Sequence, residues 1–288
     1  MDVALALDIG GTKLAAGRVA ATGRLLDHQE VPTGGADAAA LWERLATMLD
    51  TVRHGDEVVC GVGCGGPMAP GGTTVSPLNI PQWRDFPLRG RLADHLGLPV
   101  GIDNDAKALA LGEGWCGAAR GVRDFVALVV STGVGGGIVL DGRLLDGAGA
   151  NAGHIGHVVV EPDGRRCACG GRGCLEAEAS GPSIEAITGQ PAAGAPLAMR
   201  QRTGTLVGRA VASVANLLDL RLAVVAGSVA LGFGTPFFTA AQAELDFRAR
   251  IEFSRGARIV PAGLGASGPL VGAAAVGWRA LGRLPGVS

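Results

Sequence analysis

The chain has 288 residues, of which 48% are hydrophobic and 18% are charged, and this composition excludes a disordered protein. Its 25 basic and 26 acidic residues leave a net charge of −1 without a block of like charges. That balance argues against a basic surface for nucleic acid or anionic lipid. At roughly 100–200 residues per domain, the length predicts one large domain or two modest ones.

The first residues lack the basic segment that opens a secretory signal peptide. The most apolar stretch, residues 125–140, is shorter than the ~20 apolar residues that a membrane-spanning helix needs. We therefore expect a cytoplasmic protein with no membrane segment, whose six cysteines stay reduced.

In chain order, a strand–glycine turn–strand pattern occurs twice, about 120 residues apart. The two copies are strands 3–7 and 13–19 around a turn at 8–12, and strands 125–130 and 138–140 around a turn at 131–137. The repetition predicts a duplicated architecture with two related lobes.

Elsewhere, strand-like runs alternate with stretches of helical periodicity, which is typical of an α/β protein. Further strands are expected at residues 98–102, 222–226 and 257–262. Helices are expected at residues 41–49, 104–116, 206–218, 236–249 and 269–281.

The two glycine turns are candidate phosphate cradles, because glycine lets backbone N–H groups approach an anion closely. Neither matches a Walker A loop or a dinucleotide fingerprint, and both could be ordinary hairpins. The first turn is favoured as functional by Asp8, which can reach magnesium, and by Thr12 and Lys13, which can reach phosphate oxygens.

A histidine and three cysteines follow the second turn, at His157, Cys167, Cys169 and Cys174. Three thiolates and one imidazole complete the closed tetrahedral shell of a structural zinc site. Glycines between the cysteines would let such a knuckle fold tightly. A disulfide is disfavoured by the expected compartment, so the spacing predicts zinc.

The acidic run Asp103-Asn104-Asp105 follows a strand-like segment and opens a helix. These residues could simply cap the helix. Alternatively, they place a carboxylate at the carboxyl end of a strand, where ligand clefts of α/β proteins lie. The acidic run alone leaves both interpretations open and favours the cap.

Taken together, the motifs resemble the ROK family (repressors, open reading frames and sugar kinases) of the actin-like ATPase superfamily. The motifs occur in order as DIGGTK (8–13), NDA (104–106), STGVGGG (131–137), GHIGH (153–157) and CACGGRGCLEAEASG (167–181). The resemblance covers essentially the whole chain.

This resemblance implies a two-lobed actin-like (ribonuclease H-like) α/β fold with a structural zinc knuckle. Residues 1–104 would form a small N-terminal lobe and residues 105–288 a larger one, whose C-terminal helix can pack back on the small lobe. It also implies an ATP-dependent kinase for the 6-hydroxyl of a hexose or amino-hexose, with Asp105 as general base.

The remaining site residues are carried over in the same way. Sugar contacts are expected from Gly66, Asn79, Asn104, Asp105, His154, His157 and Glu176. Mg-ATP contacts are expected from Asp8, Gly10, Gly11, Thr12, Lys13, Thr132, Gly133, Val134, Gly135 and Gly227. The zinc ligands would be His157, Cys167, Cys169 and Cys174.

The acceptor stays open, because two features of the sequence disagree. His154 stands where many sugar-binding members have glutamate, and its surroundings resemble bacterial N-acetylmannosamine kinases. The segment 76–81, followed by Trp83, is instead similar to glucokinase-type members. Glucose, N-acetylmannosamine, N-acetylglucosamine and an amino-sugar such as kanosamine all remain candidates.

Other functions are less favoured. A sugar-sensing repressor of this family carries a helix-turn-helix domain ahead of the sugar lobe, and the Asp8 turn leaves no room for one. A sugar-binding protein without activity is disfavoured by an intact Asp105. A polyphosphate donor would favour a basic groove, which the charge pattern does not suggest. By family analogy we expect a homodimer.

Overall fold

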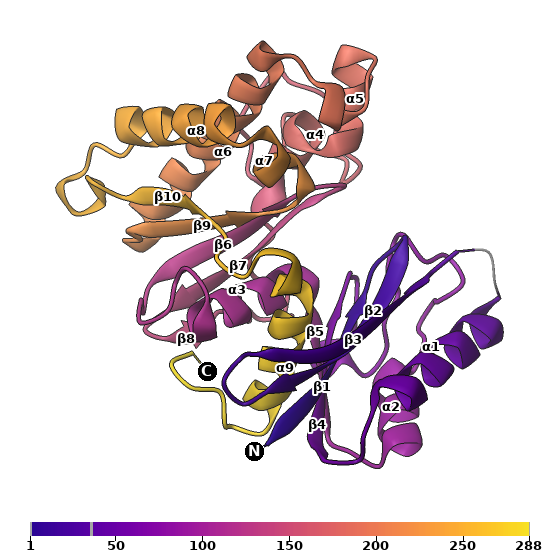
Figure 1. Ribbon diagram of the computed structural model, residues 1–288. Helices are drawn as coiled ribbons and strands as arrows, with labels where there is room; N and C mark the ends of the chain where they lie inside the picture. Colours follow the sequence, from indigo (N-terminus) through magenta and orange to yellow (C-terminus); the bar gives the residue numbers. More distant parts are fainter. Residues whose placement is uncertain (1, 35–36, 288) are drawn as a thin grey trace. The chain divides into compact units, whose positions relative to one another are not determined.

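The computed structural model describes residues 2–34 and 37–287, and two five-stranded sheets form its framework (Figure 1). The chain divides into two compact units. The first is formed by Met1–Gly121, Gly147–Ala150 and Leu264–Ser288, and the second by Val122–Asp146 and Asn151–Gly263. The sequence analysis placed a boundary after residue 104, whereas this division groups the helix at 105–116 with the first sheet.

The first sheet has the strand order β3-β2-β1-β4-β5. Its strands are β1 (Val3–Ile9), β2 (Lys13–Ala20), β3 (Leu25–Pro32), β4 (Glu57–Cys64) and β5 (Val100–Asn104). The first three strands form an antiparallel meander, and β4 and β5 then run parallel to β1.

The second sheet repeats this plan, with the strand order β10-β9-β6-β7-β8. Its strands are β6 (Phe125–Val130), β7 (Val134–Leu140), β8 (Arg143–Leu144), β9 (Leu222–Ala226) and β10 (Arg258–Pro261). Here β6, β7 and β8 form the antiparallel meander, and β9 and β10 run parallel to β6. The predicted duplication is therefore confirmed.

Helices pack on both faces of the first sheet (Figure 1). They are α1 (Ala38–Val52), α2 (Leu88–Leu96), α3 (Asp105–Cys116) and α9 (Gly268–Ala280). α1 begins where the Asp37 carboxylate accepts a hydrogen bond from the Ala40 N–H at 2.8 Å. Its leucines and Trp42 then recur at helical spacing and bury one face. α9 packs against β1, β2, β4 and β5, while α3 packs against α9.

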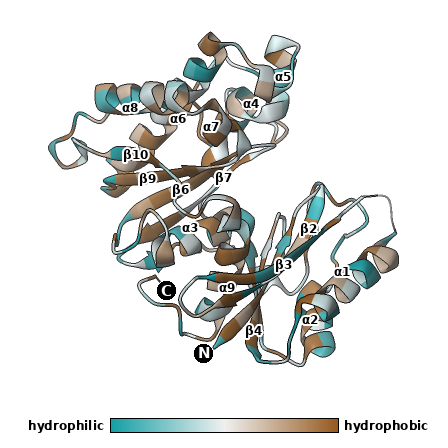
Figure 2. Cartoon of the chain, in the orientation of Figure 1, coloured by the Kyte–Doolittle hydropathy of each residue, from teal (hydrophilic) through white to brown (hydrophobic). Residues whose placement is uncertain are grey.

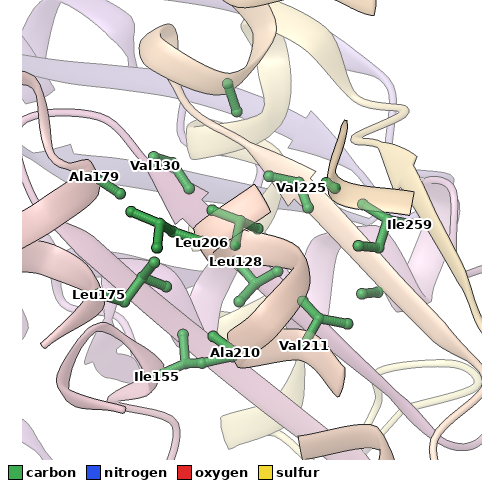
Figure 3. Close-up of a cluster of buried hydrophobic side chains, with 14 of the residues drawn as sticks. Leu128, Val130, Ile155, Leu175, Ala179, Leu206, Ala210, Val211, Val225 and Ile259 are labelled. Atoms are coloured by element: carbon green, nitrogen blue, oxygen red, sulfur yellow. The ribbon is translucent and has the colours of Figure 1, made fainter. Parts of the chain in front are cut away.

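The second unit has its own core, in which side chains from β6, β9 and β10 meet those of α4 and α6 (Figure 3). Its helices are α4 (Leu175–Ala179), α5 (Gly181–Thr188), α6 (Leu197–Leu218), α7 (Ser228–Phe233) and α8 (Thr235–Arg248). Hydrophobic colour follows β6 and β9, and hydrophilic colour marks parts of α8 (Figure 2). Among the described residues, no helix has both the length and the hydrophobicity to cross a bilayer.

The second glycine turn is shorter than predicted. It covers only residues 131–133, because β7 already begins at Val134 and Gly135–Gly137 pair with β6. These glycines are needed for packing rather than for turning. A Cβ on Gly136 would lie 3.0 Å from Ile155 Cγ2 and 3.2 Å from the Gly153 oxygen. The strand therefore lets segment 153–156 approach its backbone.

A substitution at Gly61 of β4 tests how closely α9 packs against the first sheet. A Cβ on Gly61 would collide with the Ala273 carbonyl and lie 2.6 Å from the Gly277 nitrogen. Gly61→Ala is expected to lower the free energy of unfolding by roughly 1–3 kcal/mol through overpacking. Gly90→Ala in α2 is the control, because nothing lies within 4 Å of its Cβ position. It should instead stabilise by roughly 0.5–1 kcal/mol. Urea unfolding of both variants measures the difference, and equal effects would contradict this packing.

Candidate active site

In the first unit, acidic residues gather at the carboxyl ends of the parallel strands. Strand pairing places Asp8 of β1 beside Gly63 of β4, and Gly63 beside Asp103 of β5. A Cβ on Gly63 would lie 3.8 Å from Asp8 Oδ1 and 3.7 Å from Asp105 Cα. Asp8 and Asp105 therefore both lie beside Gly63, close enough for the charge of Asp105 to act on Asp8.

This arrangement concentrates negative charge. Burial, and secondarily the neighbouring Asp105, raises the pKa of Asp8 from 3.8 to about 7, although Lys13 opposes the shift. Burial also raises the pKa of the Cys64 thiol, with Asp105 and Asp8 adding to the effect. Carboxylates crowded in this way are stabilised by a divalent cation, and magnesium prefers such oxygen ligands.

The start of α3 resolves the two interpretations of the acidic run. Asn104 is the N-cap, and its Oδ1 accepts a hydrogen bond from the Ala106 N–H at 3.0 Å. Asp105 is the first helical residue, and it is exposed, with Oδ1 2.8 Å from the same N–H. The run therefore caps the helix through Asn104 and also presents the Asp105 carboxylate to solvent.

The first glycine turn is closed by a hydrogen bond from the Gly10 N–H to the Lys13 oxygen at 3.0 Å. Thr12 and Lys13 are exposed, and Lys13 Nζ lies 2.5 Å from Glu30 Oε1 of β3. Gly11 lies against Asn79, since a Cβ on this glycine would collide with the Asn79 Cβ. The structure thus brings an expected sugar residue to the expected phosphate turn.

Gly66 lies in the same region as Asn79. Its oxygen accepts a hydrogen bond from the Leu78 N–H at 3.2 Å, and the Gly66-Pro67 peptide bond is cis. The chain after β4 therefore folds back so that its start and the segment 76–80 run together. These contacts bring Gly66 and Asn79, two expected sugar residues, together with the first glycine turn.

A cavity of about 400 Å³ opens beside this group, in the size range of small-molecule sites. Asp8, Lys13, His28 and Glu30 line it from the sheet, and Ser267 and Pro269 line it from the start of α9. The sequence analysis missed His28 and Glu30 as site residues, because β3 was not predicted and no motif marks them.

The Asp8 environment makes stability depend on pH. Since its pKa is 3.8 in the unfolded chain and about 7 in the native protein, the native state holds this proton over that whole interval. The contribution of Asp8 to the free energy of unfolding therefore falls as pH rises from about 4 to about 7. Without added magnesium, Asp8→Asn should lose this slope and raise the melting temperature above that of wild type at about pH 8. Asp94→Asn, an exposed residue of α2, is the control. Parallel melting curves for Asp8→Asn and wild type between about pH 5 and 8 would refute the claim.

In the second unit, the turn 131–133 lies at the carboxyl end of β6. The Ser131 N–H donates to the Gly133 oxygen at 2.9 Å, and the Ser131 oxygen accepts from the Gly181 N–H at 2.8 Å. Thr132 is exposed at the turn, whereas Val134 and Gly135 belong to β7. The Ser131 and Ser228 hydroxyls lie 2.9 Å apart, which joins this turn to the end of β9.

Two further expected residues contact this turn or the strand before it. Gly227 has φ +99°, and a Cβ there would collide with the Val130 backbone, so the position requires glycine. Glu176 of α4 accepts a hydrogen bond from the Val134 N–H at 2.9 Å. The sequence analysis gave no role to Ser131, although this residue opens the STGVGGG motif.

The histidine and cysteines come together as predicted. The ligand atoms of His157, Cys167, Cys169 and Cys174 all lie within 4.8 Å of one another. Cys167 Sγ is 3.7 Å from His157 Nδ1, and Cys169 Sγ is 3.8 Å from Cys174 Sγ. Tetrahedral zinc, with bonds of about 2.0–2.3 Å, sets its ligand atoms roughly 3.3–3.8 Å apart. The cluster therefore fits a zinc ion.

The knuckle also positions the neighbouring side chains. Cys174 is the N-cap residue of α4, and Glu176 lies two residues later in the first turn of that helix. The rings of His154 and His157 are stacked with their centroids 6.0 Å apart. Glu178, which is buried, accepts hydrogen bonds from the Arg165 N–H and from Arg202, and so supports the loop before the cysteines. The knuckle thus positions three of the expected sugar residues, namely His154, His157 and Glu176.

Comparison with known proteins agrees with this geometry. The family model described as "ROK family" matches residues 4–279. The chain belongs to the ROK family. Over 246 residues it is 39% identical to an N-acetylmannosamine kinase of Citrobacter koseri, covering 80% of this chain and 84% of that protein.

Solved structures of ROK proteins have the same fold. A ROK hexokinase from Thermus thermophilus matches with a TM-score of 0.84 and 33% identity, over 97% of this chain and 99% of that chain. A ROK glucokinase from Streptomyces griseus, solved with glucose and AMPPNP, matches with a TM-score of 0.82 and 29% identity, over 96% and 99%. The predicted α/β fold is thereby confirmed for this ROK protein.

Proposed function

We propose that this ROK protein is an ATP-dependent sugar kinase that transfers the γ-phosphate of Mg-ATP to the 6-hydroxyl of a hexose or amino-hexose. Its relatives named as kinases of N-acetylmannosamine, hexose and glucose support kinase activity. The observation that carries the proposal is the exposed Asp105 carboxylate, set close to Asp8 at the carboxyl ends of parallel strands.

In the proposed reaction, Asp105 accepts the proton of the sugar 6-hydroxyl as that oxygen attacks the γ-phosphorus. The bond from γ-phosphorus to the β–γ bridging oxygen breaks, and ADP leaves. Such a transfer needs mainly positioning and charge neutralisation. The turns at residues 10–13 and 132–135 would hold phosphate oxygens through backbone N–H groups other than those of Gly10 and Val134, which already donate to the Lys13 oxygen and to Glu176. Lys13 would add a positive charge. Gly227 would lie near the nucleoside.

Magnesium, when bound, neutralises phosphate charge, and Asp8 would hold it directly or through water. The raised pKa of Asp8 supports this role, because a cation at that position would favour the ionised carboxylate. Zinc would be structural, held by His157, Cys167, Cys169 and Cys174. It would fix the segment that carries His154 and Glu176.

Sugar hydroxyls would be held by Asn104, His157 and Glu176, and further sugar contacts would come from Gly66, Asn79 and His154. Asn104 adjoins Asp105, so the base and one orienting amide share a single helix start. The acceptor is one of N-acetylmannosamine, glucose, N-acetylglucosamine or an amino-sugar such as kanosamine. We further propose that the protein acts in the cytoplasm as a homodimer.

The proposal is tested by measuring ADP release from Mg-ATP with zinc-replete protein and a panel of these sugars. We expect one preferred sugar to stimulate ADP release well above the sugar-free rate. Sugar binding seen by calorimetry without any ADP release would instead indicate a sugar-sensing or sugar-binding protein. Neither binding nor ADP release with any sugar on the panel would overturn the proposal for these acceptors.

A further inference from the structure

The ammonium group of Lys107, two residues after the candidate base Asp105 in α3, is buried. Lys107 of α3 is 2% exposed, and its Nζ lies 3.0 Å from Asp103 Oδ1. The other oxygen of Asp103 lies 3.4 Å from Arg279 Nη1, at the end of α9. A buried cation is tolerated only when it is paired, so this cluster is fixed in position.

The cluster holds the junction from which the site residues project. Asp103 Oδ1 also accepts a hydrogen bond from the Asn104 N–H at 2.8 Å. The same carboxylate oxygen is therefore shared by Lys107 and by the backbone at the end of β5. In the chain, Asn104 and Asp105 lie between Asp103 and Lys107. The geometry of this ion pair therefore sets the backbone geometry of both residues.

Lys107 also contacts a short segment that enters the first unit from the second. Its Nζ lies 3.5 Å from the carbonyl oxygen of Ala150. Gly147–Ala150 belong to the first unit, while the chain on both sides belongs to the second. Ala150 has φ +61°, a left-handed conformation that is uncommon for alanine, and the chain then continues to His154. The ammonium thus links the start of α3 to the segment 147–150, which belongs to the same unit.

We propose that Lys107 is a positioning residue for phosphoryl transfer, which fixes both the Asn104-Asp105 junction and the segment 147–150. This inference rests on the proposed function. A buried ion pair contributes little net stability, because desolvation offsets most of its attraction. Its effect here is on geometry, and misplacing a catalytic group by about 1 Å can cost on the order of 10²-fold in rate.

The matched comparison is Lys107→Met against Arg18→Met. Arg18 is 7% exposed and forms a buried ion pair with Glu57, with Nε 2.7 Å from Oε1. Glu57 begins β4, so this pair lies at the end of the same sheet opposite to Asp8 and Gly63. Both variants lose the cation of a buried pair, and we expect both to lower the melting temperature.

Only Lys107→Met is expected to lower kcat, by on the order of 10²-fold, with the KM for ATP within a few-fold of wild type. Lys107→Arg should restore most of the rate. If Lys107→Met does not fold, the double variant Asp103→Asn/Lys107→Met removes both charges, and its kcat should be equally low. A kcat within about twofold of wild type in folded Lys107→Met or in folded Asp103→Asn/Lys107→Met, matching Arg18→Met, would overturn the inference.

Hydrogen exchange tests the same inference without catalysis. The amides of residues 104–106 and 147–150 should exchange faster in Lys107→Met than in wild type, and at the wild-type rate in Arg18→Met. Unchanged exchange in both would overturn the anchoring role. If wild type shows no sugar-dependent ADP release while exchange changes as expected, the proposed function fails and the anchoring role stands.

Discussion

Asp105→Asn is expected to lower kcat for sugar-dependent ADP release by about 10²–10⁴-fold, with little change in sugar or ATP affinity. The amide keeps the shape of the side chain but cannot accept the hydroxyl proton. Because Asn104 rather than Asp105 is the N-cap of α3, the helix start should survive the change. Steady-state kinetics with the preferred sugar, together with sugar binding by calorimetry, measures both effects.

Asp94→Asn provides the matched control, since Asp94 is exposed on α2 in the same unit and lies outside the candidate site. It should keep wild-type kinetics. A folded Asp105→Asn protein with kcat within about threefold of wild type would exclude Asp105 as the general base.

Cys174→Ser is expected to lose the bound zinc, to lower the melting temperature markedly and to abolish sugar binding. The knuckle has little apolar core of its own, with Cys167, Cys174 and Ala177 as its buried cluster, so the metal supplies its stability. Cys174 stands at the N-cap position of α4 without a capping hydrogen bond from its side chain, so the metal holds this helix start. Loss of the metal would release Glu176 from the Val134 N–H. Elemental analysis, melting curves and calorimetry measure the three effects.

Cys116→Ser is the control for this variant. Cys116 lies in α3 of the first unit and is not one of the four ligands, so its loss should leave one zinc per chain. Removal of zinc from wild type by a chelator should reproduce the Cys174→Ser phenotype, and added zinc should reverse it. Full sugar binding by metal-free wild-type protein would contradict a zinc-organised pocket.

The parts of the fold that local pattern determines were predictable. Both copies of the strand–turn–strand unit contain apolar runs interrupted by glycine, and both antiparallel pairs, β1 with β2 and β6 with β7, are confirmed in the two sheets. By contrast, β3 is an exposed edge strand rich in charged residues, so it gives little apolar signal. α2 was also missed, since it follows Pro87, contains Gly90 and is short.

The candidate site also has parts that the sequence predicts and parts that it does not. The knuckle was predictable because its ligands are close in sequence and their chemistry is specific. The approach of Asp8 to Asp105 was not, because it depends on the register of β1 with β4 and of β4 with β5. The buried partnership of Lys107 with Asp103 and Arg279 likewise requires α9 to return to the first sheet.

The identity of the phosphorylated product tests the central claim most directly. The preferred sugar is incubated with Mg-ATP and the protein, and the product is examined by proton–phosphorus correlation NMR. We predict a phosphate ester whose phosphorus correlates with the two protons on carbon 6, formed by wild type and essentially absent with Asp105→Asn. A phosphorus that correlates with another sugar position, or free phosphate without any sugar ester, would contradict the account.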